Sequence, residues 1–412
     1  MSKERILLTV VTFKKSGPWS PEDIADEMKE LVKTCGGVVV DTVFCRLEAP
    51  TAPTYITKGK VEELTALCST GVADTVIFSC DLKGSQQRNL EDAFGIKTID
   101  RTQLILDIFA RHAKSSEGKM QVELAQLEYL MPRLVGKGIE LSRLGGGIGT
   151  MGPGETKLEV DRRRIADRIA KLKKDLKEIS LSRQVKRKKR QNEQIPLISL
   201  VGYTNAGKST LLNTLTAAGT ITNDGLFTTL DSLARQYVLP SKRKVVFSDT
   251  VGFMHDLPHR LIESFKATLE EVQQADLLLH VIDISHPNYM NFYNAVDVVL
   301  KELGVLEKPT IIVLNKIDKI QERAWLASVG AQFPNALLLS GLNGENLELL
   351  LERIDYMLSD GMVEIDVKIP IDRMDLVNLA HQQGRVIDVK YLSRSIRLHA
   401  SLPQKIAAQF NV

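Results

Sequence analysis

The stretch that decides the fold is 196–209, PLISLVGYTNAGKS, in which a short apolar run leads directly into a glycine-rich turn. The run 196–201 predicts a buried strand, and residues 210–215 favour a helix. In a GxxxxGK[ST] pattern so placed, backbone N–H groups wrap phosphates, the lysine reaches the β- and γ-phosphates, and the hydroxyl coordinates Mg²⁺. The sequence therefore predicts a P-loop nucleotide-binding domain. Its eight residues are Gly202, Tyr203, Thr204, Asn205, Ala206, Gly207, Lys208 and Ser209.

Two further motifs identify the nucleotide. The strand predicted at 244–247 is followed by a DxxG pattern, whose aspartate would hold Mg²⁺ through water and whose glycine N–H would sense the γ-phosphate. The strand predicted at 309–314 ends in NKxD, whose carboxylate can accept both N1–H and N2–H of guanine, an edge that adenine lacks. We therefore expect GTP rather than ATP, with the lysine lying along the base and ribose. The residues are Asp249, Thr250, Val251 and Gly252 in the first motif, and Asn315, Lys316, Ile317 and Asp318 in the second.

Two loops complete the predicted site. The first switch loop is expected at Phe227, Thr228, Thr229, Leu230 and Asp231, where a threonine closes over Mg²⁺ and the γ-phosphate. Thr229 is our choice for that threonine, and Thr228 is the alternative. The predicted metal ligands are thus Ser209 and Thr229, with Asp249 acting through water. The last base contact, a backbone N–H to the guanine O6, is expected from Ser340, Gly341 and Leu342.

The hydrolytic step has no predicted side-chain base. Many GTPases carry a glutamine directly after the DxxG glycine, but here that residue is Phe253, so intrinsic hydrolysis should be slow. Stabilisation of the phosphate would come from Lys208, Thr229 and Gly252. Asn205 is a candidate K⁺ ligand, because this residue type occurs at that point in potassium-activated relatives, and the alternative is a turn residue. His255 and His259 are interpreted as surface residues of the second switch.

The chain divides into four predicted parts. Residues 1–112 alternate β-rich runs with helical stretches, which is typical of an α/β domain with a parallel sheet. Residues 113–194 read as an antiparallel helical hairpin with a glycine-rich loop at its tip. The G domain is expected at 195–360, and 361–412 predict a small α+β domain. The fold class is therefore α/β, with the P-loop domain flanked by these additional parts.

One segment of the hairpin is strongly basic. Residues 157–193 contain 15 basic and six acidic side chains, although the whole chain carries a net charge of only +3. Release of counterions from a polyanion favours binding by such a cluster, so we expect nucleic acid, most plausibly RNA. Sequence-specific reading is not expected, because aromatic residues for base stacking are lacking. The candidate RNA-binding residues are Arg162, Arg163, Arg164, Arg168, Lys171 and Lys174.

Composition excludes several other classes. No apolar run reaches the roughly 18 to 20 residues that a membrane span needs, and the N-terminus lacks the features of a signal peptide. The four cysteines show no CxxC spacing, which argues against a zinc or disulfide framework. We expect a cytoplasmic protein, monomeric, with Mg²⁺ and GTP or GDP as ligands and K⁺ as a further candidate.

Several stretches outside the nucleotide motifs resemble the HflX family of translational GTPases, within the TRAFAC Obg-HflX group. The resemblance runs over nearly the whole chain, although Thr57 stands where the family usually has glycine. The matching stretches are Gly59–Lys60 with Glu63–Leu64, Asn89–Glu91, Asp100–Thr102, Gln121–Leu127, Gly152–Thr156 with Leu158–Glu159, Phe253 with Asp256–Pro258, and Thr268–Glu270.

The resemblance implies a GTPase that binds the 50S ribosomal subunit and its rRNA and, in the GTP form, splits or rescues stalled 70S ribosomes during stress. The hairpin tip would then reach towards the peptidyl transferase region, and the ribosome would stimulate hydrolysis. A second hypothesis is a GTPase in RNA maturation or large-subunit assembly that uses the basic hairpin as an RNA clamp. A third, a membrane-linked regulatory scaffold, is disfavoured because no lipidation motif or apolar span is present.

Overall fold

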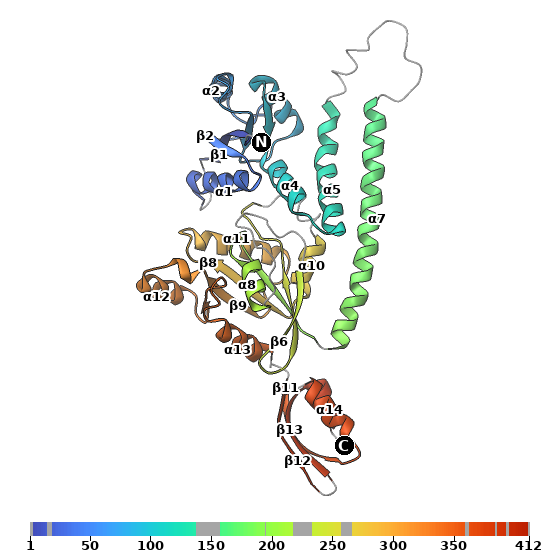
Figure 1. Ribbon diagram of the computed structural model, residues 1–412. Helices are drawn as coiled ribbons and strands as arrows, with labels where there is room; N and C mark the ends of the chain where they lie inside the picture. Colours follow the sequence, from blue (N-terminus) through green and yellow to red (C-terminus); the bar gives the residue numbers. More distant parts are fainter. Residues whose placement is uncertain are drawn as a thin grey trace.

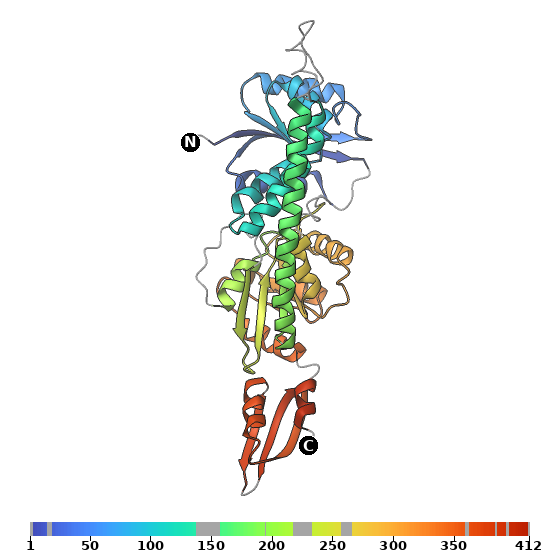
Figure 2. The same cartoon turned by 90° about the vertical axis from the view of Figure 1, so that its right-hand side faces the viewer.

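The computed structural model describes residues 3–14, 19–136, 157–193, 195–216, 233–256, 266–358, 362–383, 385–392 and 395–410. These residues form three sheets. The N-terminal sheet lies at one end, the six-stranded sheet in the middle and the C-terminal sheet at the other end, and the long helix α7 runs beside the first two (Figures 1 and 2). The predicted first switch (227–231), His259 and the glycine-rich loop fall outside the described residues.

The N-terminal domain is a parallel α/β sheet with the strand order β2-β1-β3-β4, as its alternating pattern predicts. Its helix α1 begins with a capping box, in which the Ser20 hydroxyl accepts from the Asp23 N–H and the Asp23 carboxylate accepts from the Ser20 N–H. The short strand β4 was not predicted. The elements are β1 (Arg5–Phe13), α1 (Pro21–Thr34), β2 (Val38–Leu47), α2 (Lys58–Ser69), β3 (Thr75–Phe78), α3 (Gly84–Phe94), β4 (Lys97–Ile99) and α4 (Arg101–His112).

Two helices then pack side by side, as the apolar periodicity predicts. They are α5 (Ser116–Leu130), continued by the 3-10 turn η1 (Met131–Gly136), and α7 (Lys157–Asn192). The pairs Glu117–Arg183 (2.5 Å) and Glu128–Lys173 (2.7 Å) join the helices in antiparallel order. Among the described helices, none combines the length and apolar character needed to cross a membrane.

The central domain is a six-stranded sheet with the order β10-β9-β8-β5-β7-β6, in which only β6 pairs antiparallel. All residues of β5 are buried, which fits the continuous apolar run of its sequence. The elements are β5 (Leu197–Gly202), α8 (Lys208–Leu215), β6 (Leu233–Val238), β7 (Lys244–Asp249), α10 (Lys266–Gln274), β8 (Leu277–Asp283), α11 (Tyr289–Glu302), β9 (Thr310–Asn315), η2 (Ile317–Lys319), α12 (Arg323–Gln332), β10 (Leu337–Leu338) and α13 (Leu347–Leu358).

The C-terminal domain is an antiparallel sheet of order β11-β13-β12, with α14 packed on the side of its apolar core. Its three strands coincide with the three β-rich runs that predict a small α+β module. The elements are β11 (Met362–Pro370), α14 (Met374–Gln383), β12 (Arg385–Tyr391), β13 (Ser395–Pro403), α15 (Gln404–Ala407) and η3 (Ala408–Phe410).

One apolar core joins the N-terminal and G domains. A single cluster of buried side chains includes Ile105 and Phe109 of α4 together with Tyr203, Phe253 and Met254 of the G domain. Because burial of apolar area stabilises by about 25 cal/mol per Å², this shared core stabilises the contact between the two domains. The N-terminal domain therefore lies directly against the P-loop and the DxxG segment.

Candidate nucleotide site

The P-loop turns sharply at two glycines that no other residue could replace without strain. Gly202 ends β5 with a φ of 155°, and a Cβ there would lie 2.3 Å from the Val281 carbonyl oxygen. Gly207 begins α8 with a φ of 93°, and a Cβ there would lie 2.3 Å from Nδ2 of Asn315. The turn is thus pressed against strands β8 and β9, and the N-terminus of α8 faces the resulting loop.

Lys208 lies beneath the loop. It is buried, and its Nζ donates to the carbonyl oxygens of Gly202 (3.0 Å) and Tyr203 (2.8 Å). Burial lowers the pKa of Lys208 to about 8, with Lys316 acting in the same direction and Asp249 opposing it. A desolvated ammonium held by two carbonyls inside the loop interacts strongly with any phosphate that enters.

Ser209 and Asp249 meet at the ends of α8 and β7. The Ser209 hydroxyl donates to Oδ2 of Asp249 at 2.6 Å, and the Asp249 side chain is completely buried. The neighbouring Thr250 hydroxyl donates to the Leu200 carbonyl and fixes the strand end (2.7 Å). A hydroxyl beside a buried carboxylate supplies the oxygen ligands that Mg²⁺ prefers, so these residues fit the predicted metal.

The NKxD residues hold the adjacent loops together. The Asn315 amide donates to the Ala206 carbonyl (2.8 Å), and Lys316 Nζ donates to the Asn205 carbonyl (2.7 Å). Lys316 also pairs with Asp283 at the end of β8 (2.7 Å), a partner that the sequence analysis missed. The sequence signal was an acidic residue at the end of an apolar run, and the pairing of Asp283 with Asn315 across β8 and β9 brings that residue to Lys316.

The 340–342 loop lies against NKxD. The Ser340 hydroxyl donates to Oδ1 of Asp318 (2.6 Å), which orients that carboxylate. The Gly341 N–H donates to Oδ1 of Asn315 (2.9 Å). Leu342 is mostly exposed. The loop is therefore placed to support the base site mainly through Asp318.

Phe253 does not face the phosphate side. Its side chain is buried in the core shared with the N-terminal domain. Its N–H donates to the Gly202 carbonyl (3.1 Å), and its carbonyl accepts from the Thr204 N–H (2.8 Å). The start of the second switch therefore runs alongside the P-loop. His255, interpreted from the sequence as a surface residue, is only partly exposed, and its ring stacks on Trp19 with the ring centroids 4.5 Å apart.

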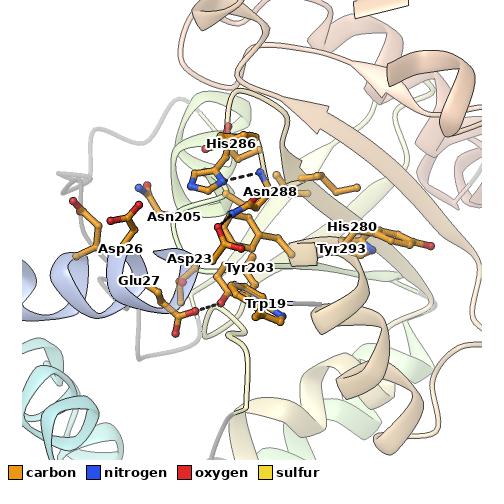
Figure 3. Close-up of a pocket in the computed structure, with 18 residues that line it drawn as sticks. Trp19, Asp23, Asp26, Glu27, Tyr203, Asn205, His280, His286, Asn288 and Tyr293 are labelled. Carbon is orange, nitrogen blue, oxygen red and sulfur yellow. Dashed lines mark hydrogen bonds between the residues drawn. The ribbon is translucent and has the colours of Figure 1, made fainter. Parts of the chain in front are cut away.

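The N-terminal domain forms one wall beside the P-loop. A cavity of about 270 Å³ lies between α1, the P-loop and the turn that precedes α11. Figure 3 shows Glu27 of α1 bonded to Tyr203. Trp19 stacks on Tyr203 with ring centroids 6.2 Å apart, and Asn288 donates to Asp23. Neither Trp19 nor Glu27 was predicted to belong to the site, because they lie about 180 residues from the P-loop.

Some basic side chains of α7 are exposed, whereas others pair with acidic residues of α5. Arg162, Arg163, Arg164, Lys171 and Lys174 are exposed. Arg168 is exposed too, but it forms a bidentate pair with Glu123 of α5 at 2.6 and 2.7 Å, and Lys173 pairs with Glu128. The prediction that Arg168 lies on the outer face of the helix was wrong, because its guanidinium contacts the neighbouring helix.

Comparison with known protein families covers most of the chain. Residues 22–110 match the family described as GTP-binding GTPase N-terminal, and 112–190 match the GTP-binding GTPase middle region. Residues 197–316 match the 50S ribosome-binding GTPase family, and 326–411 match the HflX C-terminal domain.

Two sequence relatives match this chain over most of their length. "GTPase HflX" of Caldanaerobacter subterraneus subsp. tengcongensis is 46% identical over 98% of this chain and 92% of its own length. "GTPase HflX" of Escherichia coli K12 is 38% identical over 89% of this chain and 94% of its own length. A GTP-binding protein of Sulfolobus solfataricus in complex with GDP is 26% identical, covering 86% of this chain and 98% of that one, with a TM-score of 0.43. On the sequence relationship, this chain belongs to the HflX family and is a GTP-binding, GTP-hydrolysing enzyme.

Proposed function

We propose that this GTPase binds the 50S ribosomal subunit and, in its GTP form, splits or rescues stalled 70S ribosomes. The observation that carries the proposal is the match of residues 197–316 to the 50S ribosome-binding GTPase family. The exposed arginines at the start of α7 support it, because ribosomal RNA is a polyanion. In this proposal the protein acts as a cytoplasmic monomer, and GTP hydrolysis releases it from the subunit.

The chemistry at the site follows from the residues that surround it. The P-loop N–H groups of 202–209 and Lys208 bind the β- and γ-phosphates, while Asp318 selects guanine. Gly252 lies against Thr204, where a Cβ would be 2.8 Å from the Thr204 Cα, so its main chain is close to the phosphate loop. Because Phe253 offers no hydrogen bond to water, orientation of the attacking water depends on main-chain groups of both switches.

Metal binding belongs to the same proposal. Ser209 and Thr229 would hold Mg²⁺ directly, and Asp249 would hold it through water. When bound there, the ion would help to neutralise the negative charge that develops on the phosphates during hydrolysis. Asn205 is the proposed K⁺ ligand, on an exposed turn with a φ of 61° that equally suits a turn residue.

A second function, RNA maturation or large-subunit assembly, is favoured by the same exposed basic residues of α7. The two functions differ in the partner they require: for this second function free RNA would suffice, and assembled subunits would not be needed.

The decisive experiment is steady-state GTP hydrolysis with and without purified 50S subunits, in KCl and in NaCl. We expect 50S subunits to raise kcat by at least about tenfold, since fixing the switches supplies the order that the missing glutamine would have provided. No stimulation by subunits, together with stimulation by free RNA, would favour the second function. Stimulation by K⁺ alone would assign the rate to Asn205.

Neutralising Arg162, Arg163 and Arg164 to glutamine should weaken binding to 50S subunits. Each lost phosphate contact should also reduce the slope of log K against log salt by about 0.7 to 0.9. Nucleotide affinity should stay unchanged, because these residues are remote from the P-loop. The measurement is sedimentation with subunits at several salt concentrations. The matched control neutralises the exposed Lys29, Lys33 and Lys58 of the N-terminal domain. Equal losses in both triple variants would contradict a specific role for α7.

A further inference from the structure

A network of hydrogen bonds, in which the side chains of Arg101 and Glu27 are nearly buried, connects the N-terminal domain to both the P-loop and the second switch. It consists of Glu27, Arg101, Tyr203, His255 and Asp256, and we call it the interdomain network. Glu27 accepts from the Tyr203 hydroxyl and from Arg101, each at 2.5 Å. Arg101 also donates to the carbonyl oxygens of His255 (2.5 Å) and Asp256 (3.0 Å), and the Tyr203 hydroxyl accepts from the His255 N–H (2.9 Å).

The network is placed at the point where the nucleotide state is read. His255 and Asp256 follow Gly252 by three and four residues. Phe253, directly after Gly252, bonds to the P-loop through both its N–H and its carbonyl oxygen. Arg101 is the first residue of α4, whose N-terminus is fixed by the Asp100 carboxylate accepting from the Gln103 N–H (2.8 Å). The capped N-terminus of α4 therefore holds the Arg101 guanidinium against the main chain of the second switch.

Burial makes these hydrogen bonds costly to break. The side chains of Arg101 and Glu27 are only 8% and 9% exposed, and the rings of Trp19 and His255 cover the same region. A buried charge is costly without its partners, so the switch carbonyls cannot leave Arg101 without either finding substitutes or drawing Arg101 with them. Figure 3 shows Trp19 and Glu27 close to Tyr203.

We propose that Arg101 is a positioning residue for GTP hydrolysis, which ties the main chain after Gly252 to α1 and α4. Movement of the second switch between nucleotide states then moves or loosens these two helices. Arginine is required because its planar fork reaches Glu27 and two carbonyls at once, which a lysine ammonium cannot do. The proposal rests on the GTPase activity alone and is independent of ribosome binding.

The test is hydrogen–deuterium exchange of the full chain with GDP and with a non-hydrolysable GTP analogue. In the wild type, we expect exchange in residues 19–34 and 101–112 to differ between the two nucleotides by about tenfold. In Arg101→Lys and in Tyr203→Phe, the difference should remain at 252–256 and disappear in α1 and α4. For Arg101→Lys, kcat should change by at least about threefold while KM for GTP stays within about twofold.

Arg133→Lys is the matched control. Arg133 is also mostly buried and pairs with Asp100 at 2.8 Å, beside Arg101, but its recorded partners all lie within residues 82–129. It should lower the melting temperature without changing the nucleotide-dependent exchange. Tyr203→Phe removes one hydroxyl and covers the case in which Arg101→Lys fails to fold. Nucleotide-dependent exchange in α1 and α4 that survives in both network variants, or that is lost equally in Arg133→Lys, overturns the proposal.

Discussion

Asp318→Asn should change the preferred nucleotide from GTP to xanthosine triphosphate. The asparagine oxygen can still accept N1–H, but its amide would oppose the N2 amino group of guanine and instead match the C2 carbonyl of xanthine. Hydrogen bonds to charged groups contribute about 1.5 to 3 kcal/mol, so losing the charge and one bond should weaken GTP binding by about 100-fold. Competition between fluorescent GDP and either triphosphate measures the change.

The substitution isolates the base contact because the loop around it should survive. The Ser340 hydroxyl donates to Oδ1 of Asp318, and an asparagine oxygen accepts the same bond. The control is Asp283→Asn, which removes the charge that holds Lys316 but leaves the base carboxylate intact. That variant should bind GTP and GDP less tightly without gaining affinity for xanthosine nucleotides. Full guanine preference in Asp318→Asn would refute the assignment.

Lys208→Ala should abolish productive GTP turnover. Lys208 is the buried cation inside the P-loop, and losing one donor to the transition state typically costs about 100 to 1000-fold in kcat. Single-turnover hydrolysis at saturating nucleotide separates this loss from weaker binding. Lys308→Ala is the control, since that lysine also donates to a carbonyl in the G domain, of Ala275 at 2.7 Å, but away from the loop. Turnover within about tenfold of wild type in Lys208→Ala would contradict the role.

A pH series on the wild type gives the same conclusion independently. Burial lowers the pKa of Lys208 to about 8, so the free protein loses this charge as the pH rises through that value. Bound phosphate favours the protonated lysine, so GTP binding must take up a proton above pH 8. Affinity should therefore be constant below that pH and fall by up to about tenfold per unit above it.

The nucleotide motifs and most of the strands could be predicted from sequence because their signals are local. The apolar run before Gly202, the strand ends at Asp249 and Asn315, and the alternating C-terminal strands each lie within about ten residues. Strand order was not predictable in the same way. The neighbours of β5 in the sheet are β7 and β8, which are not consecutive with it in the sequence and are reached through crossover connections. The three-residue strand β4 is too short to give a periodic pattern.

The contacts that sequence reasoning missed are those between distant segments. Glu27 and Tyr203 are separated by 176 residues, and Arg101 and His255 by 154. Nothing in the local pattern around Glu27 distinguishes it from the exposed acids of the same helix. For α7, helical periodicity located the apolar seam, but it could not show that the long side chain of Arg168 bends back to Glu123.

Because α7 is long, a small rotation of the helix next to the P-loop would cause a large displacement at its opposite end. A 36-residue helix is about 54 Å long, and α7 ends at Asn192, only a few residues before β5, which carries the P-loop at its other end. If α7 rotated by about 10° about its G-domain end, its far end would be displaced by about 9 Å. A rotation of about 10° next to the P-loop would thus displace the opposite end of α7 by more than the roughly 5.4 Å pitch of the helix.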